Sequence, residues 1–142
     1  MLFRSGLEYN PLADDLGLLA NWRVVEEGER SPMVMVGTSS DRIGTPEGRA
    51  YYATVSKDLE RHLDLPVAPY VGAAYGEFDG EWVVIAGARI RWTGEVTSTH
   101  LWDSENLHHM VDLAVTDGLR AGVLLVQQDE DYYLGLSTGY SF

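Results

Sequence analysis

The sequence contains no cysteine. Neither a disulfide framework nor a cysteine-ligated metal site can therefore form. A chain without thiols suits a protein that crosses an oxidising periplasm. Basic residues are also few: 10 Lys and Arg stand against 22 Asp and Glu, which gives a formal net charge of −12. A nucleic-acid partner is not expected, because phosphate binding requires a basic surface.

Long apolar runs are missing as well. No window approaches 18 uninterrupted apolar residues, so no transmembrane helix is predicted. No secretion signal is predicted in this sequence, since strand-like alternation begins directly after Met1. No helical pattern is long enough for the crossover that parallel strands need, which disfavours a parallel sheet. With 142 residues, the chain is expected to form one domain, 1–142.

The last eleven residues, 132–142, alternate large side chains with small ones. Tyr132, Leu134 and Leu136 begin the large series, and glycine or serine fills most positions between the large ones. A period of two indicates a β-strand with one apolar face and one small or polar face. The chain ends on Phe142. An amphipathic final strand with an aromatic end is therefore predicted.

The same alternation recurs along the chain, interrupted by turn residues. It predicts ten strands, at 2–9, 16–25, 32–39, 49–57, 66–78, 82–92, 95–102, 107–116, 120–128 and 132–142. A helical turn fits 57–65, and a helix that begins at Ser104 is an alternative for 104–117, where β-branched residues favour a strand. Because all connections are short, the predicted fold is an all-β, antiparallel up-and-down (meander) barrel of about ten strands. In it, strand 132–142 pairs with 2–9.

Strand 82–92 indicates what each face of the barrel meets. Arg89 and Arg91 share one face, and Trp82 and Trp92 lie at the two ends of the other. Charged residues behind an apolar stripe are typical of a polar lumen inside a lipid-facing barrel. Ten residues at about 3.3 Å each, tilted by roughly 40°, rise about 25 Å, the height of the apolar band of such barrels. Trp82 and Trp92 are thus expected near the two membrane interfaces.

Alternation that ends in Tyr140-Ser141-Phe142 resembles the closing strand of bacterial outer-membrane β-barrels. The resemblance implies a location in the bacterial outer membrane, in contact with the lipid bilayer. It also implies that the barrel-insertion machinery reads the C-terminal strand. Tyr140 and Phe142 join the expected interface aromatics. For an exported barrel, the sequence is expected to be the mature form.

A looser resemblance links the chain to the YjbH-like outer-membrane barrels that are associated with exopolysaccharide export. It is carried by turn and strand-edge patterns at 37–49, 52–57, 69–72 and 102–106, together with His108. The resemblance implies a small structural or export-associated component that is not an enzyme. No catalytic residue, cofactor or metal site is predicted, and a monomer is favoured.

Six charged residues fall on the predicted inward face of the barrel. They are Arg4, Glu8, Arg23, Arg89, Arg91 and Asp112. They could form a selectivity lining or a plug of ion pairs and hydrogen bonds. The plug is favoured, because barrels of this size are mostly filled by their own side chains.

Two other functions compete with this prediction. A soluble, lipocalin-like barrel would bind a small apolar ligand, and it would carry its apolar residues inside and its charges outside. A hydrolase at the rim of an outer-membrane barrel would need His100, Asp103 and His108 to converge beside a serine such as Ser104. His108 and His109, as neighbours in a strand, are expected on opposite faces. The face that carries the apolar residues decides between the outer-membrane barrel and the soluble, lipocalin-like barrel.

Overall fold

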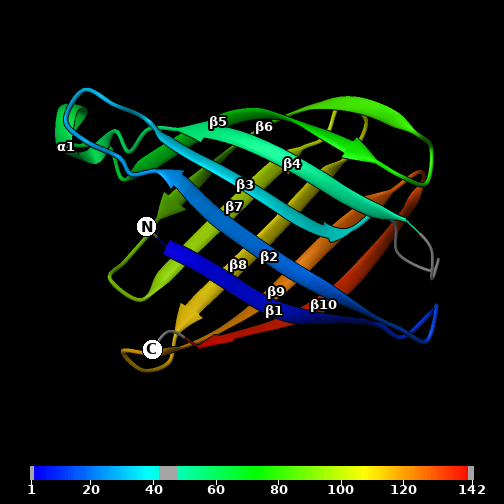
Figure 1. Cartoon of the computed structure of the whole chain (residues 1–142). Helices are drawn as coiled ribbons and strands as arrows, with labels where there is room; N and C mark the ends of the chain where they lie inside the picture. Colours follow the sequence, from blue (N-terminus) through cyan, green and yellow to red (C-terminus); the bar gives the residue numbers. More distant parts are fainter. Residues whose placement is uncertain (1, 42–47, 141–142) are drawn as a thin grey trace. The chain divides into compact units, whose positions relative to one another are not determined.

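The computed structural model describes residues 2–41 and 48–140, apart from the side chains of residues 2–4, 61 and 140. In chain order its elements are β1 (Leu2–Asn10), β2 (Asp15–Val25), β3 (Met33–Ser40), β4 (Arg49–Ser56), α1 (Glu60–Leu63), β5 (Val67–Gly76), β6 (Glu81–Arg91), β7 (Val96–Trp102), β8 (Leu107–Ala114), β9 (Leu119–Gln128) and β10 (Asp131–Tyr140). The sheet order follows the chain order from β1 to β10 (Figure 1).

The predicted fold class, all-β with the strand order of an antiparallel up-and-down barrel, is confirmed. Each predicted strand is present, and its described ends differ from the prediction by at most two residues. Segment 104–117 contains strand β8 rather than a helix, and the helical turn predicted in 57–65 is α1.

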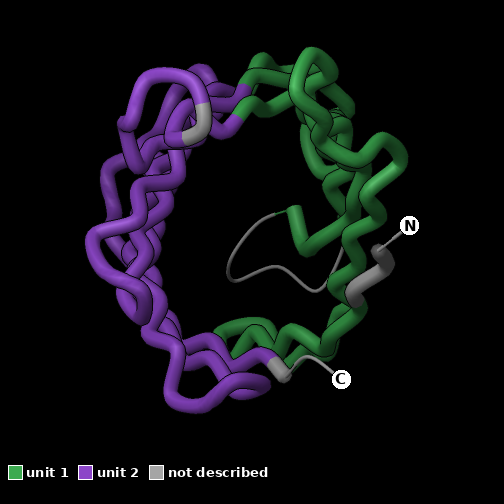
Figure 2. The backbone as a smooth tube through the Cα atoms, turned by 90° about the vertical axis from the view of Figure 1, so that its left-hand side faces the viewer, with its two compact units in different colours: residues 1–57, 71–85 green, residues 58–70, 86–142 purple. Residues whose placement is uncertain are grey.

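The chain divides into two compact units, residues 1–57 with 71–85 and residues 58–70 with 86–142 (Figure 2). Strands β5 and β6 contribute residues to both units. The pairing of 132–142 with 2–9 and the single domain 1–142 stay predictions.

In the first unit, one face of the sheet is apolar. Leu7 lies directly opposite Leu18, and Trp22 lies opposite Val36. Directly opposed residues of antiparallel strands share a face, so these side chains form continuous apolar rows. Leu7, Leu18 and Trp22 are all exposed. Together with Tyr9, Leu16, Val36 and Tyr51, they form what we call the apolar face of the first unit.

In the second unit, the apolar face is a row of aliphatic side chains across three strands. Val111 of β8 lies opposite Val123 of β9, which in turn lies opposite Leu136 of β10. All three are exposed, and Leu136 reaches 86% exposure. We call this row, with Leu113 and Leu134, the apolar face of the second unit. In each unit we call the face opposite the apolar face the mixed face. In the second unit it carries a second row of directly opposed residues, Thr97, Asp112, Gly122 and Ser137.

Burial is inverted relative to a water-soluble protein. Among the described residues, the buried side chains are the polar Asn10, Thr54, Thr97 and Ser98, and one large apolar residue, Ile85. Large apolar residues are exposed along the strands of both units. A soluble domain is stabilised by removing such side chains from water, and burial contributes about 1.5–3 kcal/mol for each. The described strands thus leave their large apolar side chains exposed, whereas most of the side chains they bury are polar.

Two strand glycines lie under the rings of tyrosines from neighbouring strands. In the first unit, the ring of Tyr52 covers Gly37, where a Cβ atom would lie 2.5 Å from the ring. The Tyr52 hydroxyl donates to Oδ1 of Asn21 at 2.6 Å. In the second unit, Tyr70 covers Gly87 and donates to the His100 carbonyl at 3.0 Å. An aromatic side chain over a strand glycine stabilises a bend that bulkier residues would block.

A single lysine fastens the turn between β2 and β3. Lys57 Nζ donates to the carbonyls of Gly28 at 2.5 Å and Glu29 at 3.1 Å, and it lies 3.4 Å from the Glu27 carboxylate.

We expect Lys57→Met to lower the free energy of unfolding by about 1–2 kcal/mol, because these acceptors lose a charged donor. Urea unfolding followed by fluorescence measures the loss. Lys57→Arg, which retains the charge, should lose less, and an unchanged midpoint for Lys57→Met would contradict the assignment.

Candidate functional site

The charged residues predicted for the inward face in the first unit share one face of the sheet. Arg4 lies opposite Asn21, and Glu8 lies opposite Gly17. Asn21, Gly17 and Arg23 are separated by even numbers of residues along β2, so all of them share one face, and Arg23 lies opposite Met35. The Glu8 carboxylate accepts the backbone N–H of Ser40 at 3.1 Å. The side chain of Arg4 lies outside the described part of the chain. The mixed face of this unit is thus held in part by side chain to backbone hydrogen bonds.

In the second unit, charges of both signs lie on the mixed face. Arg91 is paired with Thr97, which is paired with Asp112. The Asp112 carboxylate interacts electrostatically with the positive charges of Arg120 and Arg89. A Cβ atom on Gly122 would lie 2.5 Å from Oδ1 of Asp112, so this carboxylate fills the space above the glycine. Mixed signs in a filled space are typical of an ion-pair network.

Arg91 has a partner that the sequence pattern did not reveal. Its guanidinium pairs with the Glu60 carboxylate of α1, and it lies 3.6 Å from the Asp58 carboxylate. The backbone of Arg91 also donates to the Pro66 carbonyl at 2.8 Å. Arg91 therefore fastens the β4–β5 connection to the end of β6.

The predicted interface tryptophans are both exposed at the ends of β6. Trp82 is 72% exposed and contacts Tyr75, with ring centroids 5.4 Å apart. Trp92, just beyond β6, is 64% exposed. The other two predicted interface aromatics, the side chain of Tyr140 and all of Phe142, lie outside the described residues.

The convergence of His100 with His108 that the hydrolase alternative needs does not occur in the sheet. His108 is paired with Leu101, whereas His100 is paired with His109, so His100 and His108 lie on opposite faces. The reason is the register: each residue of β7 lies opposite a residue of β8 whose number has the other parity, so two even-numbered residues on the two strands point to opposite faces. The prediction that His108 and His109 point to opposite faces is confirmed. His108 instead pairs with Asp103, with Nε2 2.7 Å from Oδ2.

Asp103 organises the turn between β7 and β8. Its Oδ1 accepts the backbone N–H of Asn106 at 2.7 Å and that of Glu105 at 3.2 Å. Burial acts to raise the pKa of the Asp103 carboxyl, but hydrogen bonds from His108 and from these two N–H groups outweigh it. The pKa therefore lies below its ordinary value of 3.8.

This lowered pKa predicts an acid-dependent loss of stability. A carboxyl whose pKa is lower in the folded state stabilises the fold above the unfolded pKa, and this contribution is lost as the pH falls through the folded pKa. We expect Asp103→Ala to cost about 1–3 kcal/mol at pH 7. The difference in unfolding free energy between the two proteins should shrink as the pH falls below 3.8. Urea unfolding at several pH values measures it, and a difference that does not vary with pH would contradict the assignment.

A hydrogen-bonded chain of side chains crosses the apolar face of the second unit. The alternation of the sequence does not predict it. The Trp92 indole N–H donates to Ser98 Oγ at 2.9 Å, and Oγ lies 3.1 Å from His100 Nε2. Nδ1 of His100 lies 2.8 Å from Nδ1 of His109. The signal that could have found this pair is the four-residue turn at 103–106, which sets the register of the two strands.

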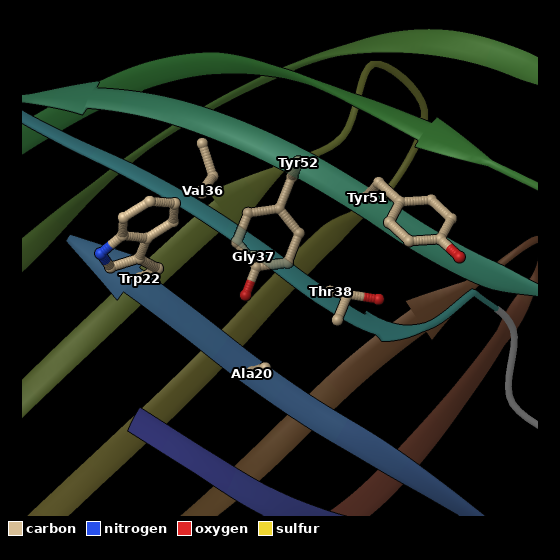
Figure 3. Close-up of a pocket in the computed structure, with 7 residues that line it drawn as sticks. All are labelled: Ala20, Trp22, Val36, Gly37, Thr38, Tyr51 and Tyr52. Atoms are coloured by element: carbon tan, nitrogen blue, oxygen red, sulfur yellow. The ribbon is translucent and has the colours of Figure 1, made fainter. Parts of the chain in front are cut away.

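A shallow cavity of about 340 Å³ opens on the apolar face of the first unit. Figure 3 shows Trp22 and Tyr51 at its two sides, with Val36 between them and Tyr52 over Gly37. Ala20 and Thr38 complete its lining. None of the lining side chains is a carboxylate, histidine or amine, so the cavity suits apolar contact rather than acid–base chemistry.

No family model matches the chain, and no curated protein or solved structure shows significant similarity to it. None of the helices in the described residues has the length and hydropathy needed to cross a membrane. Within the same residues, no group of three or more potential metal ligands gathers.

Proposed function

We propose that the chain is a ten-stranded β-barrel of the bacterial outer membrane, with a structural or export-associated role. One observation carries this proposal: the large apolar side chains are exposed, while the buried side chains are mainly polar. In water such a surface would be costly, since exposed apolar area is unfavourable. Against lipid it is favourable, and the strands satisfy the backbone by pairing with each other.

The aromatic residues support the same placement. Trp82 and Trp92 are exposed at the two ends of an eleven-residue strand, β6. Tryptophan prefers the depth of the lipid headgroups, where its ring is apolar and its N–H can bond to polar groups. Exposed aliphatic residues occupy the middle of the strands, as with Val111 in β8 and Leu136 in β10.

The mixed face supports a filled interior rather than an open pore. Asp112 lies within reach of arginines of opposite charge, and Arg91 is paired with Glu60. Paired charges reduce the cost of removing each one from water. We therefore propose that the barrel conducts few ions. Steady single-channel conductance of the purified protein in planar bilayers would overturn this part of the proposal.

The export-associated role is the finer part of the proposal, and it extends the resemblance to exopolysaccharide-linked barrels. It predicts that removing the protein from its source bacterium lowers the amount of secreted polysaccharide, measured as sugar in the medium. Re-expression of the intact chain should restore secretion. Unchanged secretion would overturn this role and leave the membrane location standing.

The membrane proposal has a direct test in the purified chain. We expect the protein to fold in detergent micelles or lipid vesicles and to remain folded on a denaturing gel until it is heated, so that its band shifts after boiling. A lipocalin-like soluble barrel would instead be monomeric and folded in plain buffer. That outcome would overturn the membrane proposal and favour an apolar-ligand carrier.

A further inference from the structure

Two histidines from neighbouring strands meet on the apolar face of the second unit. His100 of β7 lies directly opposite His109 of β8, with Nδ1 atoms 2.8 Å apart and ring centroids 5.1 Å apart. The neighbours in the same row are Ala88 on β6 and Leu125 on β9. Because both are apolar, the pair has no carboxylate beside it in its row.

Ser98 holds the other nitrogen of His100. An indole N–H can only donate, so Ser98 Oγ must accept the bond from Trp92 at 2.9 Å. Ser98 is only 3% exposed, which fixes this oxygen in place. Its second lone pair can accept a proton on His100 Nε2, 3.1 Å away. In that tautomer Nδ1 of His100 carries a bare lone pair. Histidines that bind a metal through one ring nitrogen normally donate a hydrogen bond from the N–H of the other ring nitrogen, as His100 would do to Ser98.

We propose that His100 and His109 bind a divalent transition-metal ion through their Nδ1 atoms. Neutral imidazoles suit Cu²⁺, Ni²⁺ and Zn²⁺, whereas Ca²⁺ and Mg²⁺ need oxygen ligands. Bonds of about 2.0–2.1 Å place two nitrogens about 2.9 Å apart at a right angle and about 3.3 Å apart at a tetrahedral angle. The separation of 2.8 Å fits the right angle. Right angles are typical of Cu²⁺ and Ni²⁺.

Binding replaces one hydrogen bond with two metal bonds. In the unbound pair, His100 carries its proton on Nδ1 and donates it to the bare Nδ1 of His109, whose own proton is on Nε2. On binding, His100 loses the proton at Nδ1 and takes one up at Nε2, where Ser98 Oγ becomes its acceptor. Water fills the remaining coordination positions, because both histidines lie within three residues of the turn that joins β7 to β8, at the ends of their strands. This inference does not depend on the proposed membrane location, because strand register alone places both histidines together.

The test is a titration of Cu²⁺ into the folded full-length chain, in detergent micelles or in buffer if the chain folds there. Calorimetry should give one ion per chain, and electron paramagnetic resonance should show two nitrogen ligands. Trp92 lies at the end of the hydrogen-bonded chain, so its fluorescence should be quenched. His109→Ala should weaken binding at least about tenfold and Ser98→Ala by about tenfold, because partners of ligands are worth 10–100-fold in affinity.

The matched control is His62→Ala, which removes an exposed histidine of α1 far along the chain. It should leave Cu²⁺ affinity unchanged. Equal loss in His62→Ala and His109→Ala, or a resonance spectrum without two nitrogens, would overturn the site and indicate adventitious binding. His109→Gln provides a second variant if His109→Ala does not fold.

Discussion

Leu136→Arg is expected to destabilise the chain in a bilayer by about 2–4 kcal/mol, the cost of an arginine on the lipid-facing side near the bilayer centre. Leu136 is the sixth of ten residues in β10, and its side chain is 86% exposed. In a soluble protein, a substitution at so exposed a position would change stability by no more than about 0.5 kcal/mol. Reversible urea unfolding in lipid vesicles measures the difference.

Leu12→Arg is the matched control for this variant. Leu12 is 63% exposed, but it lies in the turn between β1 and β2 rather than within a strand. We expect Leu12→Arg to cost at most about 1 kcal/mol, the value near a membrane interface. Equal, small effects of both substitutions would contradict the lipid-facing assignment of the apolar face.

Gly87→Ala is expected to cost at least about 2–3 kcal/mol, or to prevent folding, because the added methyl group has no room. A Cβ atom at Gly87 would overlap the backbone carbonyl of His100 and lie 2.5 Å from the Tyr70 hydroxyl. Backbone cannot move aside as a flexible side chain can. The loss appears as a lower unfolding midpoint and a smaller folded fraction.

Gly139→Ala is the control in the same unit. Among the described residues, no atom lies within 4 Å of the Cβ position at Gly139, and this residue is also within a strand. Adding a methyl group there should leave stability unchanged or raise it by about 0.4–1 kcal/mol through the unfolded chain. If both alanine variants lose stability equally, the close packing of Tyr70 on Gly87 is not the cause.

The strands could be predicted because their signal is local. Alternation at 107–116 outweighs the possible cap at Ser104, and the strand β8 is confirmed. Turn residues such as those at 103–106 mark where each strand ends. The charged set on the mixed face followed from the same parity, for example Glu8, whose neighbours in sequence point the other way. Local alternation fixes which residues share a face within one strand.

Contacts between strands could not be predicted, because they depend on register. A rim hydrolase would need His100 near His108, but the pairing places His100 opposite His109. The partners of Arg91 in α1 and the cover of Tyr70 over Gly87 come from segments about 30 and 17 residues away in the chain.

What the sequence by itself determined is the strand content, the chain-order meander and which side chains share a face within each strand, because a strand alternates with a period of two. What only the tertiary structure decided is which side chains meet across that sheet: the Asp103–His108 pair, the glycines under tyrosines, and the chain from Trp92 to His109. The physical reason is that a shift of one residue in register exchanges the faces that meet. No single strand carries that information.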